Sequence, residues 1–312
     1  MMIAITPPTW PKTTAESLPR ENMQPWQQLD PLLVLPPLTL LHLLVHAPQA
    51  WYLQLLLLPL FAAGLIFRRW LHAPAFWYVT AALLGTTIYF NWESSDNHKY
   101  LFVYWCLALC SAFSLPHGEQ PATLRRSSQL LIALCMLLAT AWKACTPQYL
   151  DNRFFTYELL ADERFAHFTS WTTGLPLETL AANRELRDLQ LSYPPPGAAV
   201  PTVELAGNAH VALLAKFLTW WTVLIEGLIG GLFLLPNNVW TNRARNMLLI
   251  LFAVTTYSVA PVRGFGWMLM LLGLAQCSRD EWRYRWGYLG GMLLIQAYMI
   301  PLGAIIEILA RS

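Results

Sequence analysis

From residue 32 onward the chain alternates between long apolar runs and short polar connections. Because about 20 apolar residues in a helix cross a hydrocarbon core of ~30 Å, each run is a candidate transmembrane helix. The candidate spans are residues 32–47, 50–68, 74–91, 99–115, 129–145, 210–235, 246–261, 264–278 and 287–309. This pattern predicts an all-α polytopic membrane protein of about nine transmembrane helices, or about eight if the short first run is re-entrant.

Charges in the connections orient these helices. If the N-terminus is cytoplasmic (N-in), every short inner connection is basic, through Lys12, Arg20, Arg68, Arg69, Arg125, Arg126, Arg243, Arg245, Arg279, Arg283 and Arg285. The short outer connections hold only Lys99 and Arg263. Because short cytoplasmic loops carry an excess of Lys and Arg, we expect residues 1–31 to be a cytoplasmic N-terminal leader. Residues 32–309 would then form the transmembrane domain, with its C-terminus outside.

The longest connection, residues 146–209, would lie outside as an external amphipathic cap. Its residues 151–171 interleave acids and arginines with aromatic and leucine residues, a pattern typical of a helix in the headgroup region. A second amphipathic helix is expected after Pro176, before the proline-rich stretch 192–201 interrupts helical structure.

The composition agrees with a membrane location. With 56% hydrophobic and 12% charged residues, the chain carries about half the charge of an ordinary soluble domain. Its mean hydropathy is +0.40, so we expect the lipid bilayer as its surroundings. The net charge of +2 and the lack of a basic tract interleaved with aromatic residues exclude nucleic acid as a partner. The chain has no signal-peptide pattern, and we expect a multi-pass protein of a bacterial cytoplasmic (inner) membrane.

Several polar residues are expected at one depth, at the outer ends of the helices: His42, His46, Asn97, His98, Lys143 and Arg263. Lys143 ends an apolar run beside Trp142. It is either an anchor that extends to the headgroups or a general base, because desolvation disfavours the ammonium form. Asn97 and His98 open the fourth span on the same side, where His98 would donate to, or orient, an oxygen near Lys143.

Other candidates lie within or beside the spans. His42 and His46 share one helix face at a spacing that can bind a metal, but no second pair completes a site, and we expect no metal. Arg263 lies in an outer turn. Glu226 is a carboxylate well inside an apolar span beside Gly227. It is either a protonated residue that hydrogen-bonds between helices or part of a proton or substrate path.

Two stretches, NHKYL at 97–101 and AWKACTPQYLDNRFFTYELLADERF at 141–165, resemble the horizontally transferred transmembrane (HTTM) domain shared with vitamin K-dependent gamma-carboxylases. In that family an N-H-x-Y-L element precedes a helix, and a lysine ends the next helix ahead of a P-x-Y/W-L/V turn. The order and spacing agree here, although Trp142 and Ala144 stand where the family often carries a second lysine.

The resemblance implies that Lys143 is the base that deprotonates a reduced quinone similar to vitamin K or menaquinone, whose oxygen Asn97 and His98 would hold. Oxidation and epoxidation of this quinol would be coupled to deprotonation or carboxylation of a peptide or protein substrate at the external face. The further residues expected around the quinol are His42, His46, Trp142, Glu226 and Arg263. The alternative is a non-catalytic membrane accessory protein of the same fold that binds lipid or peptide for maturation or export.

Overall fold

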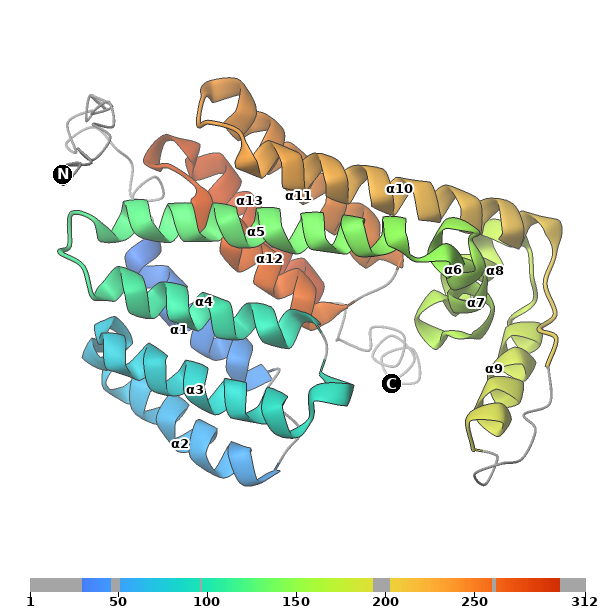
Figure 1. Cartoon of the computed structure of the whole chain (residues 1–312), viewed down its shortest axis with the longest axis horizontal. Coiled ribbons are helices and arrows are strands. Elements are labelled where there is room, and N and C mark those ends of the chain that lie inside the picture. Colours follow the sequence, from blue (N-terminus) through green and yellow to red (C-terminus); the bar gives the residue numbers. More distant parts are fainter. Residues whose placement is uncertain (1–29, 46–50, 96, 193–202, 260–261, 298–312) are drawn as a thin grey trace, which may run out of the picture. The chain divides into compact units, whose positions relative to one another are not determined.

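The computed structural model describes residues 30–45, 51–95, 97–192, 203–259 and 262–297. The chain divides into two compact units, Met1–Asp30 and Pro31–Ser312, and the described fold belongs to the second. Four predicted features lie outside the described residues: the leader, His46, the proline-rich stretch and the end of the last span. A few residues at the edges of the three segments are described. Every described element is a helix (Figure 1).

The elements follow the predicted order. They are α1 (Pro31–Val45), α2 (Trp51–Ile66), η3 (Arg68–His72), α3 (Pro74–Phe90), η4 (Trp92–Ser94), α4 (Asn97–Phe113), α5 (Gln120–Cys145), α6 (Pro147–Leu150), α7 (Arg153–Ala161), η5 (Glu163–Phe165), α8 (Ala166–Thr173), α9 (Leu177–Ser192), α10 (Ala209–Leu234), α11 (Val239–Val259), α12 (Arg263–Gln276), η6 (Arg279–Glu281) and α13 (Trp282–Ala297). The η elements are 3-10 helices. Each predicted span therefore coincides with an α-helix over its described part.

Two helices of the described chain are long and apolar enough to cross a membrane, α5 and α10, with 26 residues each. By contrast, α12 has 14 residues, about 21 Å at the rise of an α-helix, which falls short of a ~30 Å hydrocarbon core. Nearly all of its side chains are buried, so it is the central helix of the bundle, in contact with α1, α4, α5, α11 and α13. The prediction is thus confirmed for the helical fold. The predicted count of about nine transmembrane helices is not supported, because two helices of the described chain qualify as spans by length and composition.

The two long helices pack closely against each other in antiparallel directions (Figure 1). Small residues on α10 permit this approach. A Cβ atom at Gly230 would lie 2.7 Å from Leu137 Cγ, and one at Gly227 would lie 3.4 Å from Thr140 Cγ2. Glycine at a helix interface lets two backbones come together where a larger side chain would hold them apart.

The opposite face of α10 is apolar and exposed. Leu213, Phe217, Trp220, Leu224 and Leu228 recur at helical spacing and are each 46–68% exposed. Soluble proteins rarely expose continuous apolar surface of this extent. A helix that buries its polar residues and exposes its leucines is typical of a protein surrounded by lipid.

Consecutive long helices run in opposite directions, so their connections alternate between two ends of the bundle (Figure 1). The connections α2–α3, α4–α5, α10–α11 and α12–α13 lie at one end. Nine of the fourteen arginines of the described chain lie in these connections and in the adjoining helix turns: Arg68, Arg69, Arg125, Arg126, Arg243, Arg245, Arg279, Arg283 and Arg285. The other five lie in the cap segment and at the start of α12: Arg153, Arg164, Arg184, Arg187 and Arg263. A concentration of arginines in short connections at one end of the helices is the pattern that the positive-inside rule describes.

The segment predicted as an external cap forms α6, α7, η5, α8 and α9, and the helix expected after Pro176 is α9. The prediction of one continuous helix at 151–171 is wrong, because the chain breaks at Asp162, which caps the 3-10 helix η5 by accepting a bond from the Arg164 amide. Part of the apolar face of this segment packs against the protein. Phe155 and Phe165 are buried in one cluster with residues of α10.

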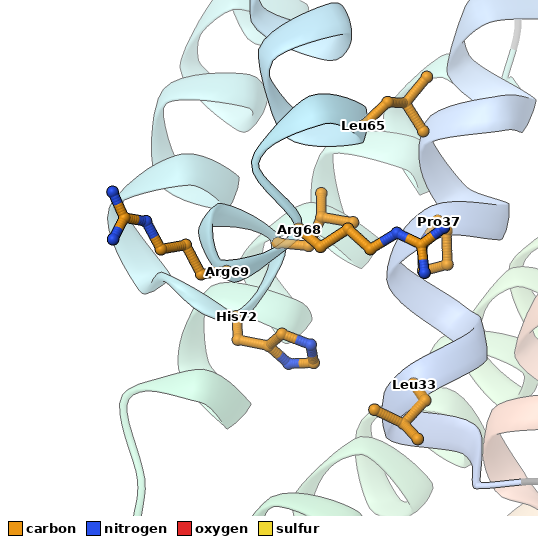
Figure 2. A pocket seen from close by; sticks show the side chains of 7 residues that line it. Leu33, Pro37, Leu65, Arg68, Arg69 and His72 are labelled. Atoms are coloured by element: carbon orange, nitrogen blue, oxygen red, sulfur yellow. The ribbon is translucent and has the colours of Figure 1, made fainter.

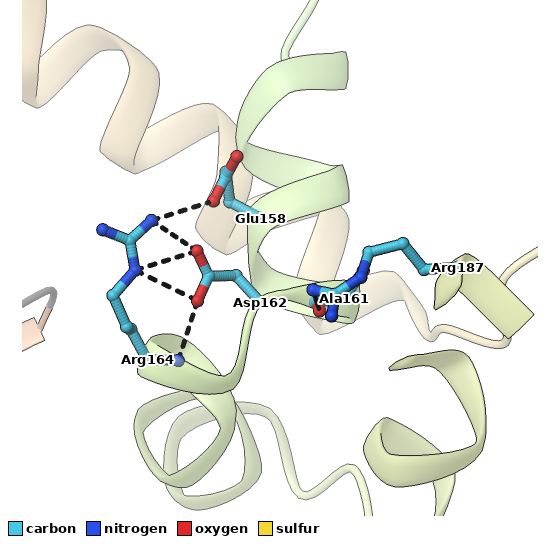
Figure 3. Close-up of polar contacts among 5 residues, drawn as sticks. All are labelled: Glu158, Ala161, Asp162, Arg164 and Arg187. Carbon is cyan, nitrogen blue, oxygen red and sulfur yellow. Dashed lines mark hydrogen bonds and ion pairs between the residues drawn. The ribbon is translucent and has the colours of Figure 1, made fainter. Parts of the chain in front are cut away.

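Polar contacts hold the cap together (Figure 3). The Arg187 guanidinium of α9 donates to the Ala161 carbonyl at the end of α7, at 2.5 Å. Arg164 lies 2.5 Å from the Asp162 carboxylate and 3.8 Å from that of Glu158, measured from the same nitrogen. Because a helix end leaves carbonyls without intrahelical partners, Arg187 satisfies one of them at the end of α7, while Arg164 joins the two carboxylates beside it.

Glu158 makes the cap sensitive to pH. Burial, followed by the hydrogen bond and the negative charge of Asp162, raises the pKa of Glu158 from 4.5 to about 7. Burial alone would also raise the pKa of Asp162, but hydrogen bonds from Arg164 bring it below its ordinary value. A raised carboxyl pKa means that the folded cap holds a proton that the unfolded chain releases, so the cap gains stability as pH falls from about 7 toward 4.5.

Candidate functional site

An ion pair joins the two long apolar helices. The Lys143 ammonium nitrogen of α5 lies 2.5 Å from Glu226 Oε1 of α10, and it donates a hydrogen bond to this oxygen. The Lys143 side chain is 14% exposed and that of Glu226 is 9% exposed. Charged groups are rarely buried to this degree unless they are paired.

The turn after α5 encloses the pair. α5 ends at Cys145, and Pro147 starts the short helix α6, which turns the chain back beneath Lys143. This turn brings the buried ring of Tyr149 to 5.3 Å from the ammonium, measured to the ring centroid. A cation held over an aromatic face is attracted by the negative charge of the ring surface.

Tyr149 also connects α6 to α10. Its hydroxyl lies 2.6 Å from Thr222 Oγ1, one helical turn before Glu226. The contacts therefore form a closed set from α5 through α6 to α10 that fixes both charged side chains. A functional constellation needs this kind of support, because groups held by packed neighbours keep their geometry.

The second oxygen of Glu226 has no hydrogen-bond partner within the described part of the chain, although it is buried. The hydroxyl of Tyr257 on α11 is also buried and without a partner among these residues. Glu226 lies within electrostatic range of Tyr257 and of Cys135 on α5. Because a buried acceptor without a hydrogen bond is unfavourable, Glu226 Oε2 is the atom of the site that is ready to bind a donor.

The structure distributes the other predicted site residues over several places. The backbone of Asn97 and His98 opens α4, but their side chains lie outside the described structure. Trp142 is 60% exposed, and its ring meets that of Tyr149 edge-on at 6.5 Å. Arg263 is exposed at the start of α12.

His42 is fully buried between aromatic rings. It stacks on Phe102 of α4 at 4.4 Å and meets Trp267 of α12 edge-on at 4.9 Å. His46, expected on the same helix face, lies outside the described residues. Within the described ranges, no group of three or more histidine, cysteine, aspartate or glutamate side chains is arranged to hold a metal ion.

Sequence reasoning treated Lys143 and Glu226 as separate candidates and missed their pairing. The residues are 83 positions apart, and no local pattern links them. The signal that could have joined them is that the two residues have opposite charge and that each lies within a predicted apolar span. Tyr149 was visible only as part of the PQYL turn, and Thr222 as one more polar residue in an apolar helix.

The chain was compared with models of protein families, with curated proteins and with solved structures, and no match was found in any of the three. The chemical character of the site therefore rests on its own contacts.

Proposed function

We propose that the chain is a multi-pass protein of a bacterial cytoplasmic membrane, with its N-terminus in the cytoplasm. Two helices of sufficient length and apolar character support this placement, together with the exposed leucine and aromatic face of α10. The arginine-rich connections at one end of the bundle support the orientation. Helices shorter than the hydrocarbon core are tolerated where the bilayer thins around them.

We further propose that the protein binds a lipophilic quinol of the vitamin K or menaquinone type and removes a proton from it, as the HTTM domain resemblance implies. The observation that carries this proposal is the buried Lys143–Glu226 pair, whose second carboxylate oxygen has no partner in the described structure. Deprotonating a hydroxyl group in an apolar site requires a proton acceptor and a cation beside the anion that forms. The pair supplies both.

The residues present fit such a ligand. Glu226 Oε2 would accept the hydroxyl proton, and the Lys143 ammonium, held by Oε1, would stabilise the resulting oxyanion. Tyr149 keeps α6 closed over Lys143, and the exposed ring of Trp142 offers an aromatic surface beside it. Asn97 and His98 at the start of α4 remain the proposed contacts of the ligand oxygen. The proposed base is therefore Glu226 with Lys143 beside it, in place of Lys143 alone.

The quinol would act as the reductant and oxygen as the oxidant: the electrons of the quinol would reduce oxygen as the quinol is oxidised and epoxidised. The resemblance extends the proposal to a peptide or protein substrate at the external face, which would be deprotonated or carboxylated. The chain's own contribution is to exclude water, because protonation by solvent would quench an anion before it could react.

A second candidate function follows from the same contact. Lys143 already has a carboxylate partner at 2.5 Å and an aromatic face nearby, an arrangement that also serves as a permanent lock between α5 and α10. In that case the protein is a non-catalytic accessory that binds lipid or peptide for maturation or export. The two functions differ in whether the pair exchanges protons with a ligand.

Quinol oxidation by the purified protein in nanodiscs, with oxygen and bicarbonate, tests the enzyme proposal. We expect epoxide formation by the wild type and its loss in Glu226→Gln, Lys143→Met and His98→Ala. Lys216→Met is the matched control, because this lysine is exposed on the same helix as Glu226. Thermal melts establish that each variant is folded. Absence of turnover with any quinol, or folded Glu226→Gln with wild-type turnover, would overturn the enzyme proposal and favour the accessory function.

A further inference from the structure

A cavity of about 450 Å³ lies between α1, the end of α2 and η3, remote in sequence from the ion pair (Figure 2). Its walls are Leu33, Pro37, Leu65, Arg68, Arg69, Leu71 and His72. Four of these side chains are apolar and three are basic or imidazole groups. We call this cavity the Arg68 pocket.

The apolar walls open outward. Leu33 is 66% exposed and Leu65 is 44% exposed, on the two helices that face each other across the pocket. The surface next to the pocket continues with Phe67 and Trp70, which are 47% and 41% exposed and whose rings lie 5.2 Å apart. Exposed aromatic residues beside arginines are typical of the level where the hydrocarbon core meets the headgroups.

Within the described part of the chain, no acidic side chain pairs with the two arginines of the pocket. Arg68 and Arg69 are both exposed. Figure 2 shows the Arg68 side chain extending across the pocket toward Pro37, whereas Arg69 points away from it. A guanidinium in an apolar setting fits a phosphate group, because its planar fork donates two parallel hydrogen bonds.

The backbone that carries Arg68 is fixed in place. The 3-10 turn closes through bonds from the Trp70 amide to Phe67 and from the Ala73 amide to Trp70. The indole of Trp77 on α3 donates to the Leu71 carbonyl at 2.7 Å. A ligand at this turn therefore meets a preformed site, which lowers the cost of ordering it.

The combination of charge and apolar surface selects the occupant. A free anion would gain binding energy from Arg68 but none from Leu33 and Leu65. An apolar molecule would leave the charge of Arg68 without a partner. The pocket also belongs to the basic end of the bundle, which would face the anionic inner leaflet of the membrane. A molecule with a phosphate at one end and an acyl chain at the other satisfies both features.

We propose that the Arg68 pocket binds an anionic phospholipid, with the phosphate on Arg68 and an acyl chain along Leu33, Pro37 and Leu65. This proposal rests on the membrane placement proposed above and is independent of the quinol chemistry. The lipid would brace α1 against α2 and η3 at the inner face of the bundle. Arg68 is then a binding residue, and Arg69 contributes only general attraction to the anionic surface.

Native mass spectrometry of the detergent-purified protein tests the proposal, with phosphatidylglycerol and phosphatidylcholine of identical chains as the probes. We expect the wild type to retain phosphatidylglycerol preferentially and Arg68→Gln to lower that retention about fivefold, the effect of one interfacial cation. Arg69→Gln, from the same turn, is the matched control and should change retention less than twofold, on the order of the screening at an exposed site. Leu33→Gln should weaken the binding of the lipid but not the binding of soluble glycerol phosphate.

Several results would overturn the proposal. Equal losses in Arg68→Gln and Arg69→Gln would mean diffuse attraction without a site. Glycerol phosphate bound as tightly as the lipid would mean a site for a soluble phosphate. Release of the protein from membranes by alkaline carbonate would overturn the membrane placement itself. A protein that stays in the membrane but shows no lipid preference would overturn the lipid site alone. Retained lipid selectivity in a protein that does not turn over quinol would support the lipid site and count only against the quinol chemistry.

Discussion

Replacing Lys143 by methionine removes the cation from a pair whose side chains are 14% and 9% exposed. Methionine keeps the length and apolar stem of lysine, so the loss is mainly electrostatic. The Glu226 carboxylate then remains buried without a partner, and breaking a buried pair in this way costs about 3 kcal/mol or more of unfolding free energy. We expect Lys143→Met to lower the stability of the bundle by about 3 kcal/mol.

Glu226→Gln is expected to cost less, about 1 to 2 kcal/mol, because the longer lysine side chain can extend toward the headgroups once it is released. The double variant carries no charge at either position and should lie within about 1 kcal/mol of the wild type. The two substitutions therefore do not add. With the double variant near the wild type, the cycle should give a coupling free energy of about 4 to 5 kcal/mol between Lys143 and Glu226.

Reversible unfolding in mixed micelles, with increasing fractions of dodecyl sulfate and helicity as the signal, measures these free energies. The cycle of Lys216→Met with Glu226→Gln is the control, because Lys216 is exposed on the same helix. Its coupling should stay below about 0.5 kcal/mol, as for independent sites. A coupling between Lys143 and Glu226 no larger than that of the control would refute the pairing, and the proposed proton acceptor with it.

Three further predictions address the helix packing and the cap. Gly230→Ala should destabilise the bundle by about 1 to 3 kcal/mol in the same micelle titration, since the new Cβ would lie 2.7 Å from Leu137 Cγ. Gly231→Ala has no heavy atom within 4 Å of its Cβ and should be neutral or stabilising. Amides of α7 should exchange with solvent more slowly as pH falls from 8 to 5, after correction for the intrinsic rate. The underlying gain is on the order of 1 kcal/mol once solvent screening is allowed for, and Glu158→Gln should abolish it. Asn152→Ala should lower the free energy of unfolding by about 1 kcal/mol, because φ at this residue is +67°. Asn152→Gly should be nearly neutral, and equal effects of the two substitutions would contradict the left-handed backbone.

The positions of the long helices could be predicted because hydropathy and turn residues report local structure. The run at 74–91 became Pro74–Phe90, and the run at 210–235 became Ala209–Leu234. α5 begins at Gln120, well before the predicted 129, since its first turns contain arginine, serine and glutamine. These residues favour a helix but lower hydropathy, so a window that measures apolar character cannot detect the start of this helix.

The role of each helix in the bundle could not be read in the same way. The run at 264–278 looks like any other span, yet α12 is buried against five neighbouring helices. The cap sequence has the pattern of a surface helix, but Phe155 and Phe165 are buried with residues of α10. In both cases the sequence specifies an apolar face, and only tertiary contacts decide whether that face meets protein or lipid.

The register between α5 and α10 links the packing of the fold to the chemistry of the site. Leu137 meets Gly230, Thr140 meets Gly227, and one turn further along Lys143 meets Glu226. Glycine at two of these steps holds the helix axes close enough for the last step to be a direct 2.5 Å contact. A larger residue at Gly230 would separate the helices and admit water between the charges, which would weaken their interaction and expose the unpartnered carboxylate oxygen. The small residues thus do more than stabilise the bundle, because they set the Lys143–Glu226 distance and so place the ammonium beside the carboxylate that is proposed to accept the proton.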